Sequence, residues 1–168
     1  MLKKIAAYLL AAFMAVIPAA MAQVTVNIAE GTLKPTPIAI PVFESDAMDR
    51  QLATDITSVI QNDLVSTGLF TITPQSAHIQ RNLSIDTQPR FADWKIIQTD
   101  ALVVGEVDRV TIEGVEFIRA SVRLWDVYGE EVMRLEGQAG RRFTAKPEDW
   151  RRIAHKIADT IYARLTGE

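Results

Sequence analysis

Residues 37–43 read PIAIPVF and residues 100–107 read DALVVGEV, and both stretches predict buried segments of the domain. The first is apolar almost throughout and predicts a segment of the core. The second contains the continuous apolar run 101–105, which is typical of a strand covered on both faces. Gly105 has no side chain, so we expect another group to pack closely against the strand at that position.

A long helix is predicted between these stretches, from about Met48 to Ser66. Its apolar residues recur at helical spacing, and Gly68 stands where a left-handed residue would end the helix. Residues 69–73 then predict a strand closed by Pro74.

A polar and irregular stretch follows at residues 75–90, with one helical turn expected near His78. A short helix is predicted over residues 91–98. Its face toward the core would carry Phe91, Trp94 and Ile97.

Two longer strands are predicted after the central strand, joined by a hairpin at residues 128–130. Apolar and polar residues alternate in both strands, from Ile118 to Leu124 and from Met133 to Glu136. One face of this hairpin is therefore expected to be covered and the other to face water.

The last helix is predicted to begin near Pro147 and to end before Gly167. Its apolar residues form one stripe, which consists of Trp150, Ile153, Ala154, Ile157, Ile161 and Leu165. The order of elements predicts an α+β fold in which two main helices pack on one face of a mixed β-sheet.

The amino terminus has the three parts of a secretory signal peptide over residues 1–22. Lys3 and Lys4 precede an apolar run at residues 5–17, and small residues at Ala20 and Ala22 fit cleavage after Ala22. The alternative is an uncleaved membrane anchor, which we disfavour because the run is shorter than the roughly 20 residues a spanning helix needs. After cleavage we expect no direct membrane insertion.

A separate amphipathic strand is predicted at residues 24–28, where apolar and polar side chains alternate. Residues 31–37 contain a glycine and two prolines, a composition that suits a linker. The sequence thus predicts a cleaved signal over residues 1–22, a tethered strand and linker over residues 23–36, and an α+β domain over residues 37–168.

Composition excludes several function classes. The 168-residue chain contains no cysteine, which rules out disulfides, thiol catalysis, thiolate metal sites and a lipidated amino-terminal cysteine. A formal net charge of −3 with no basic tail gives little support to nucleic acid as a partner.

No catalytic or metal-binding pattern is present, so the sequence predicts a protein that is not an enzyme and takes no cofactor. The two histidines, His78 and His155, lie far apart in the chain and share no ligand spacing. Glu106 and Asp108 would project from one side of a strand, but a solvated strand end explains them better than an acid–base pair. The basic stretch 141–156 is interpreted as a solvated face.

Several motifs together resemble the amino-terminal domain of TolB-type proteins of the Tol-Pal system. They span nearly the whole chain after the signal and are residues 38–43, residues 63–70, the pair Phe91 and Trp94, residues 100–107, residues 123–127 and residues 154–167. The resemblance implies a periplasmic interaction protein that supports outer-membrane integrity, envelope constriction at cell division, and import of colicins and other proteins.

The resemblance departs from the family pattern at the carboxyl end. TolB-type proteins continue into a β-propeller, whereas this chain stops at Glu168, so we expect a truncated product or a fragment of a longer reading frame. In the family the lipoprotein Pal binds the propeller. Pal is therefore an unlikely partner of this chain, and no Pal-binding residue can be carried over.

The family also implies a partner at the amino terminus, where the mature protein binds the inner-membrane protein TolA. The implied partner-binding residues are Val24, Thr25, Val26, Asn27, Ile28, Ala29, Glu30 and Gly31. An alternating strand could add to the edge of a TolA-like protein's sheet. The alternative is that this strand pairs with the domain's own sheet.

Two rival classes remain, namely other periplasmic protein-binding modules and a small hydrolase. A hydrolase would need a catalytic constellation that the sequence does not contain, so the first is the serious rival. The opening IAIPVF before a helix also resembles domains of lipoproteins that activate peptidoglycan synthases or assemble secretion pores. Those proteins carry a lipid-modified cysteine that this chain lacks. The Phe91 and Trp94 pair and the closing helix motif also favour the TolB-type reading.

Overall fold

The first core segment folds as a strand followed by a bend. The computed structural model describes residues 34–168, so the predicted signal and the strand at residues 24–28 lie outside the described residues. Strand β1 (Thr36–Ala39) begins inside the expected linker, and β2 is the short Glu44–Ser45. Pro41 separates them, and because proline has no N–H it offers no donor to a ladder there. The predicted burial is confirmed at Ile38, Ile40 and Phe43.

The predicted long helix is confirmed as α1 (Arg50–Ser66), and Gly68 after it has the left-handed φ of 74°. The next predicted elements are also present. They are β3 (Phe70–Ile72), the single-turn helix η1 (Gln75–Ala77), α2 (Phe91–Ile96) and β4 (Ala101–Ile112).

The hairpin prediction was partly wrong. The long hairpin joins β4 to β5 (Val115–Asp126), and its tight turn places both Glu113 and Gly114 at positive φ. The predicted hairpin at residues 128–130 exists, but its second strand, β6 (Glu131–Met133), has three residues. β4 was predicted only at its buried end, because its second half extends into solvent and lacks the apolar run.

Strand β7 (Arg141–Ala145) was missed altogether. It pairs antiparallel with β5, from Ile118↔Ala145 to Val122↔Arg141. Arg141, Arg142 and Thr144 make its sequence look like a solvated loop, and only the pairing with a distant strand makes it extended.

The seven strands of residues 34–168 form one mixed sheet in the order β3-β1-β4-β5-β6, with β2 beside β4 and β7 beside β5. Pairs β1–β3, β1–β4 and β2–β4 are parallel, and the pairs of β5 with β4, β6 and β7 are antiparallel. The α+β fold class is confirmed.

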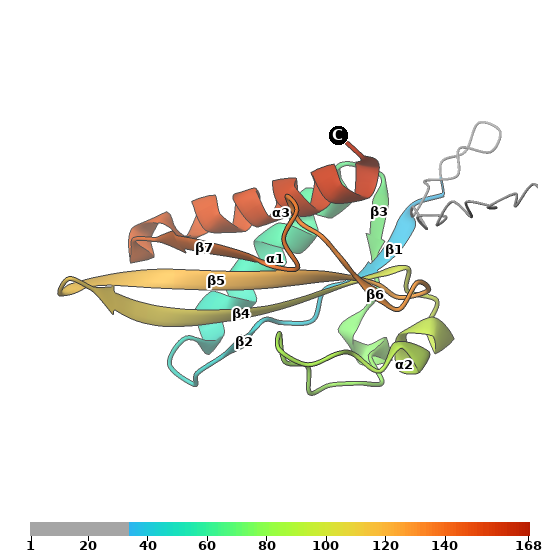
Figure 1. Ribbon diagram of the computed structural model, residues 1–168, viewed down its shortest axis with the longest axis horizontal. Coiled ribbons are helices and arrows are strands. Elements are labelled where there is room, and N and C mark those ends of the chain that lie inside the picture. The colour runs from blue at the N-terminus through green and yellow to red at the C-terminus, as the bar shows by residue number, and fades with distance from the viewer. Residues whose placement is uncertain (1–33) are drawn as a thin grey trace, which may run out of the picture.

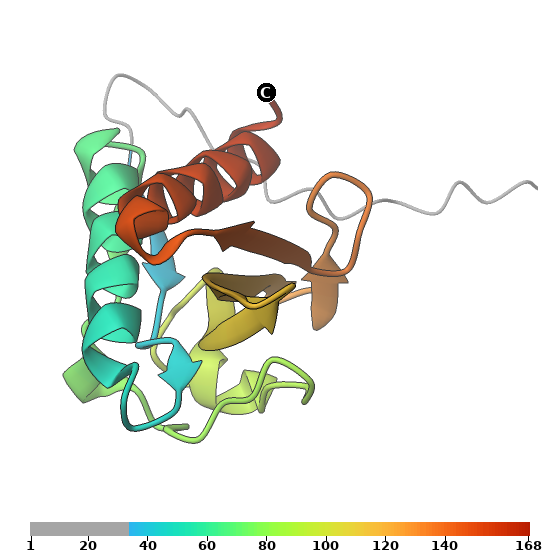
Figure 2. The ribbon, with the colours of Figure 1, turned by 90° about the vertical axis from the view of Figure 1, so that its left-hand side faces the viewer.

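The two main helices cover one face of this sheet, as predicted. The turn η2 (Pro147–Asp149) leads into α3 (Trp150–Thr166), which ends at Gly167 with φ 81°. Figure 2 shows α1 and α3 side by side on the same face of the strands. Their apolar stripes bury Ile56 and Ile60 of α1 and Ile157 and Ile161 of α3 in the main core.

The other face of the sheet is less exposed to water than predicted. α2 lies on that face, below β4 and β6 in Figure 1. Trp94 and Phe91 of α2 form a second core cluster with Leu102 and Trp125 of the sheet. The Phe91 and Trp125 rings meet edge to face with centroids 5.7 Å apart. The expected water-facing side of β5 is therefore covered at its Trp125 end, Ser121 on it is also buried, and Arg119 and Arg123 are half-buried.

Among residues 34–168, no helix is both long enough and apolar enough to cross a membrane.

Candidate partner-binding site

The eight predicted partner-binding residues, 24–31, lie outside the part of the chain that the structure describes. The described part shows the place where they join the domain. Lys34 and Pro35 lead directly into β1, which lies between β3 and β4 in the sheet. The chain enters β1 and leaves after α3 at the same end of the domain's long axis (Figure 1).

The ladder of β1 begins at Thr36. The Thr36 N–H donates to the Leu69 carbonyl at 2.8 Å, and Thr36 pairs with Phe70 in the parallel register. Pro35 precedes it and has no N–H to donate. In this register Thr36 and Ile38 bond with β3, whereas the Pro37 carbonyl accepts from Asp100 on the β4 side. Pro35 stands two residues before Pro37, so its missing N–H removes a donor on the β4 side.

A groove of about 620 Å³ lies beside this entry point. Residues from four separate parts of the chain line it, among them Lys34 and Pro35 before β1, Pro74 after β3, Asp100 before β4 and Tyr128 after β5. Tyr128 is 55% exposed. The groove thus combines an aromatic ring, prolines and two opposite charges at the base of the predicted partner-binding segment.

Asp100 gives the groove an unusual carboxyl group. Burial raises its pKa from the ordinary value, repulsion from Asp126 raises it further, and Lys34 lowers it. The backbone of Asp100 is fixed, because its N–H donates to the Pro37 carbonyl at 2.9 Å and its carbonyl accepts from the Val127 N–H at 3.0 Å. The backbone that carries the carboxyl group is therefore held by bonds that do not use the carboxyl oxygens.

The wall of the groove is anchored by buried polar contacts. The hydroxyls of Thr73 and Thr99 hydrogen-bond at 2.9 Å and join the end of β3 to the start of β4. His78 contacts the Thr73 carbonyl through Nε2 at 3.2 Å and packs edge-on against Trp94, with ring centroids 5.0 Å apart. The Trp94 indole N–H donates to Gln80 Oε1 at 3.2 Å. These contacts fix α2 and the irregular stretch against the sheet.

Glu106 and Asp108, the two carboxylates that the sequence places on one side of a strand, do not form an acid–base pair. Asp108 forms an ion pair with Arg119, and Glu106 faces Ser121 across the strand pair. Among residues 34–168, no group of three or more His, Cys, Asp or Glu side chains could hold a metal ion. His155 lies on an exposed face with Nδ1 2.6 Å from Asp63 Oδ2.

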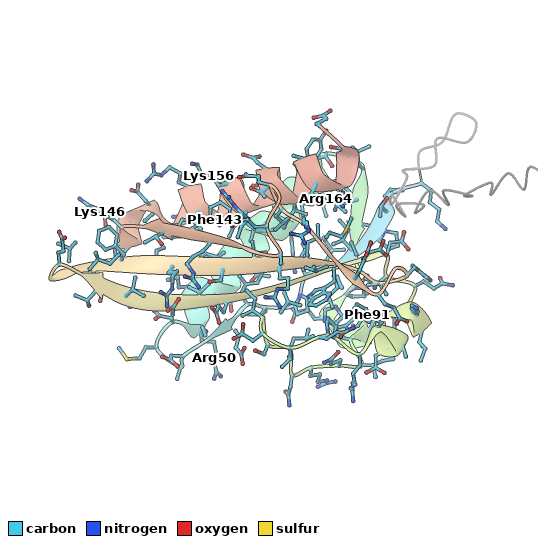
Figure 3. All side chains as sticks on the ribbon, in the orientation of Figure 1. Arg50, Phe91, Phe143, Lys146, Lys156 and Arg164 are labelled. Atoms are coloured by element: carbon cyan, nitrogen blue, oxygen red, sulfur yellow. The ribbon has the colours of Figure 1, made fainter. Side chains whose placement is uncertain are left out.

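The basic stretch 141–156 is divided between two elements. Arg141 of β7 pairs with Glu136 at 2.8 Å, and Arg152 of α3 pairs with Asp149 at 3.0 Å. Figure 3 shows Lys146 and Lys156 well apart along the length of the domain. The stretch does not gather its charges on one binding surface.

Sequence reasoning missed the groove. The only available signal was position along the chain. Asp100 precedes one buried strand and Tyr128 follows another, and side chains at such positions reach the end of a sheet. Nothing in the sequence places those two residues beside Lys34, because that proximity depends on the strand order.

The described fold is that of a small α+β domain with two helices on one face of a mixed sheet. The sequence matches the family described as TolB amino-terminal domain over residues 24–133. A Tol-Pal system protein TolB from Paramagnetospirillum magneticum (strain ATCC 700264 / AMB-1) is 43% identical over 156 residues, which cover 92% of this chain and 33% of that protein. The chain belongs to the TolB amino-terminal domain family, and it spans about a third of the length of that relative.

Solved structures share the fold at low sequence identity. The crystal structure of TolB from Acinetobacter baumannii has a TM-score of 0.62 at 20% identity and covers 80% of this chain and 29% of that chain. The structure of the hypothetical protein CT253 from Chlamydia trachomatis has a TM-score of 0.52 at 13% identity and covers 80% of this chain and 100% of that one.

Proposed function

We propose that this chain is a periplasmic component of the Tol-Pal envelope system that acts by binding a protein partner and catalyses no reaction. Family membership and the signal-type sequence at residues 1–22 support this proposal. Its role would be to support outer-membrane integrity, envelope constriction at cell division, and import of colicins and other proteins.

The proposed partner is a TolA-like inner-membrane protein, bound through residues 24–31. The observation that carries this proposal is the start of the β1 ladder at Thr36, directly after Pro35. Pro35 has no N–H, so it offers no donor on the β4 side of β1, the side on which the Pro37 carbonyl accepts from Asp100, and this favours a break between the domain's own sheet and the preceding strand. A strand on a proline-containing tether suits addition to the edge of another protein's sheet.

Backbone hydrogen bonds would supply most of the affinity in this mode, and Val24, Val26 and Ile28 would set the register. A slip of one residue would place Thr25 and Asn27 where the apolar side chains belong. Ordering the segment offsets part of the gain, so we expect a micromolar dissociation constant, about −8 kcal/mol.

Substitution within the segment tests the mode of binding. Val26→Pro removes one N–H and should abolish binding to the carboxy-terminal domain of a TolA-like protein if that N–H donates to the partner's edge. Thr25→Ser is the matched control and should bind as the unaltered chain does. Equal affinity of both variants in titration calorimetry would exclude strand addition centred on Val26.

A further inference from the structure

A second hollow, a cleft of about 330 Å³, lies away from the entry groove. Its lining includes Ser121 and Arg123 of β5, Glu106 of β4 and Arg142 of β7. Along β5 these side chains alternate with Ala120, Val122 and Leu124, which belong to the core under α1 and α3. The cleft therefore opens on the opposite face of the sheet, where β4, β5 and β7 run side by side (Figure 1).

The sheet register places three different polar groups in one row across this face. Glu106 pairs with Ser121, and Ser121 pairs with Arg142. Directly paired residues point to the same face, and neighbouring strands lie about 4.8 Å apart. A carboxylate, a hydroxyl and a guanidinium thus follow one another, with the hydroxyl in the centre.

The centre of this row contains hydrogen-bonding atoms without partners. Ser121 is 5% exposed, and its Oγ has no hydrogen-bond partner among residues 34–168. The same holds within that range for Nε of Arg123. Nε of Arg141, which also lines the cleft, is a third such atom in that range. Buried polar atoms are normally satisfied, so three unsatisfied atoms at one cleft indicate a place for an external group.

Gly140, in the turn before β7, lies close to the part of β5 that lines the cleft. A Cβ on Gly140 would come within 3.0 Å of the Val122 carbonyl oxygen and 3.8 Å of Arg123 Nε. A side chain at this position would press against the Val122 carbonyl, so the backbone lies unusually close to β5 here. This closeness shapes the floor of the cleft around Arg123.

The charges that line the cleft are balanced. Arg141 is engaged by Glu136 at 2.8 Å, which leaves Arg123 and Arg142 as guanidinium groups without an ion-pair partner in the described range. Glu106 and Asp86 also line the cleft and form no ion pair within 4.0 Å among the same residues. The lining thus contains two such cations, of which Arg123 lies over the Trp125 ring at 5.7 Å, and two such anions, so a ligand with one charge of each sign complements it.

We propose that this cleft binds a small zwitterion of the size of an amino acid or dipeptide. Its carboxylate lies on Arg142 and Arg123, since guanidinium groups bind carboxylates in a planar two-bond arrangement. The Ser121 hydroxyl lies between the charges and can donate or accept. The ammonium group of the ligand faces Glu106 and Asp86. An extended dipeptide spans about 7 Å. That length suits the row from Glu106 to Arg142, which is two strand spacings wide.

Titration of residues 23–168 with glycylglycine at pH 7, followed by amide NMR, tests this site. We expect saturable shifts centred on Ser121, Arg123 and Gly140. Arg142→Gln should raise the dissociation constant at least tenfold, and Glu106→Gln should raise it by a similar factor. Arg151→Gln is the matched control, because Arg151 lies over the Trp150 ring on α3, and it should leave binding unchanged.

Two further probes separate a zwitterion site from a general anion site. N-acetylglycylglycine lacks the ammonium group and should bind at least tenfold more weakly than glycylglycine. Inorganic phosphate should not compete with it. Phosphate binding as tight as glycylglycine binding would overturn the proposal, and so would unsaturable shifts or equal affinity of Arg142→Gln and the unaltered chain. Because Arg142 is exposed, its substitution leaves the core intact, which circular dichroism verifies.

Discussion

The ring of Phe43 occupies the space that a side chain on Gly105 would need. An added Cβ at Gly105 would lie 2.5 Å from Phe43 Cε2, and Phe43 is 3% exposed. The Phe43 N–H donates to Oγ1 of Thr57 in α1 at 3.1 Å, so the ring is held from its backbone side. Through these two contacts, Phe43 joins the bend after β1 to the central strand β4 and to the helix α1.

This contact predicts that Gly105→Ala is destabilising. The added methyl group forces the Phe43 ring aside in a packed core, which should lower the free energy of unfolding by about 1–3 kcal/mol. Urea denaturation measures the loss. Thr111→Ala on the exposed end of the same strand is the control and should change the free energy of unfolding by at most about 0.5 kcal/mol. An unchanged unfolding midpoint for Gly105→Ala would show that the contact is loose.

His78 predicts a loss of stability in mild acid. Burial lowers the pKa of His78 from its ordinary value of 6.5, and the hydrogen bond with Thr73 raises it by less. As pH falls through 6.5 the unfolded chain takes up a proton before the folded chain does, so the free energy of unfolding decreases until the lower folded pKa is passed. Above about pH 7 this contribution to stability is complete.

Urea unfolding at pH 7.5 and pH 5.5 tests the role of His78. The unaltered chain should unfold at a lower urea concentration at pH 5.5, and His78→Gln should reduce the difference between the two pH values. His155 is present in both chains, so their comparison isolates His78. An equal pH difference in both chains would assign the effect to another group.

Asp100 predicts the opposite pH dependence. Its pKa is raised, chiefly by burial, so the folded chain holds the proton more tightly than the unfolded chain. Stability from this group is therefore complete below its ordinary pKa and is lost as pH rises through the raised folded pKa. Asp100→Asn keeps both backbone hydrogen bonds and should stabilise the domain at pH 7.

Thermal unfolding of Asp100→Asn at pH 7 and pH 3.5 measures this effect. The gain in melting temperature at pH 7 should shrink at pH 3.5, where the carboxyl group of the unaltered chain is largely protonated. A gain of the same size at both pH values would point to packing instead of ionisation.

Local pattern was sufficient for those parts of the fold whose burial is continuous. The apolar run that ends at Gly105 predicted both the central strand and the close approach of another group, and the stripe that includes Ile157 predicted the face of α3. β7 could not be predicted, because Arg141 and Arg142 are extended only through their pairing with β5. The covering of Trp125 likewise depends on where α2 docks.

The candidate sites likewise differ in whether local sequence or the tertiary fold brings their residues together. The alternation from Val24 to Ile28 is a local pattern, so it yields a binding hypothesis from sequence, which stays a prediction because these residues lie outside the described range. The groove beside Lys34 and the cleft around Ser121 combine residues that are distant in the chain. Such sites become visible only when strand order and register are known.

Deletion of the predicted strand tests the central claim most directly. Residues 23–168 and a shorter chain of residues 32–168 would each be titrated calorimetrically with the carboxy-terminal domain of a TolA-like protein. Both chains retain β1 and the whole described domain, so circular dichroism should give the same spectrum for each. We predict micromolar binding, about −8 kcal/mol, by the longer chain and no measurable binding by the shorter one. Equal affinity of the two chains would contradict the account and remove residues 24–31 from the interface.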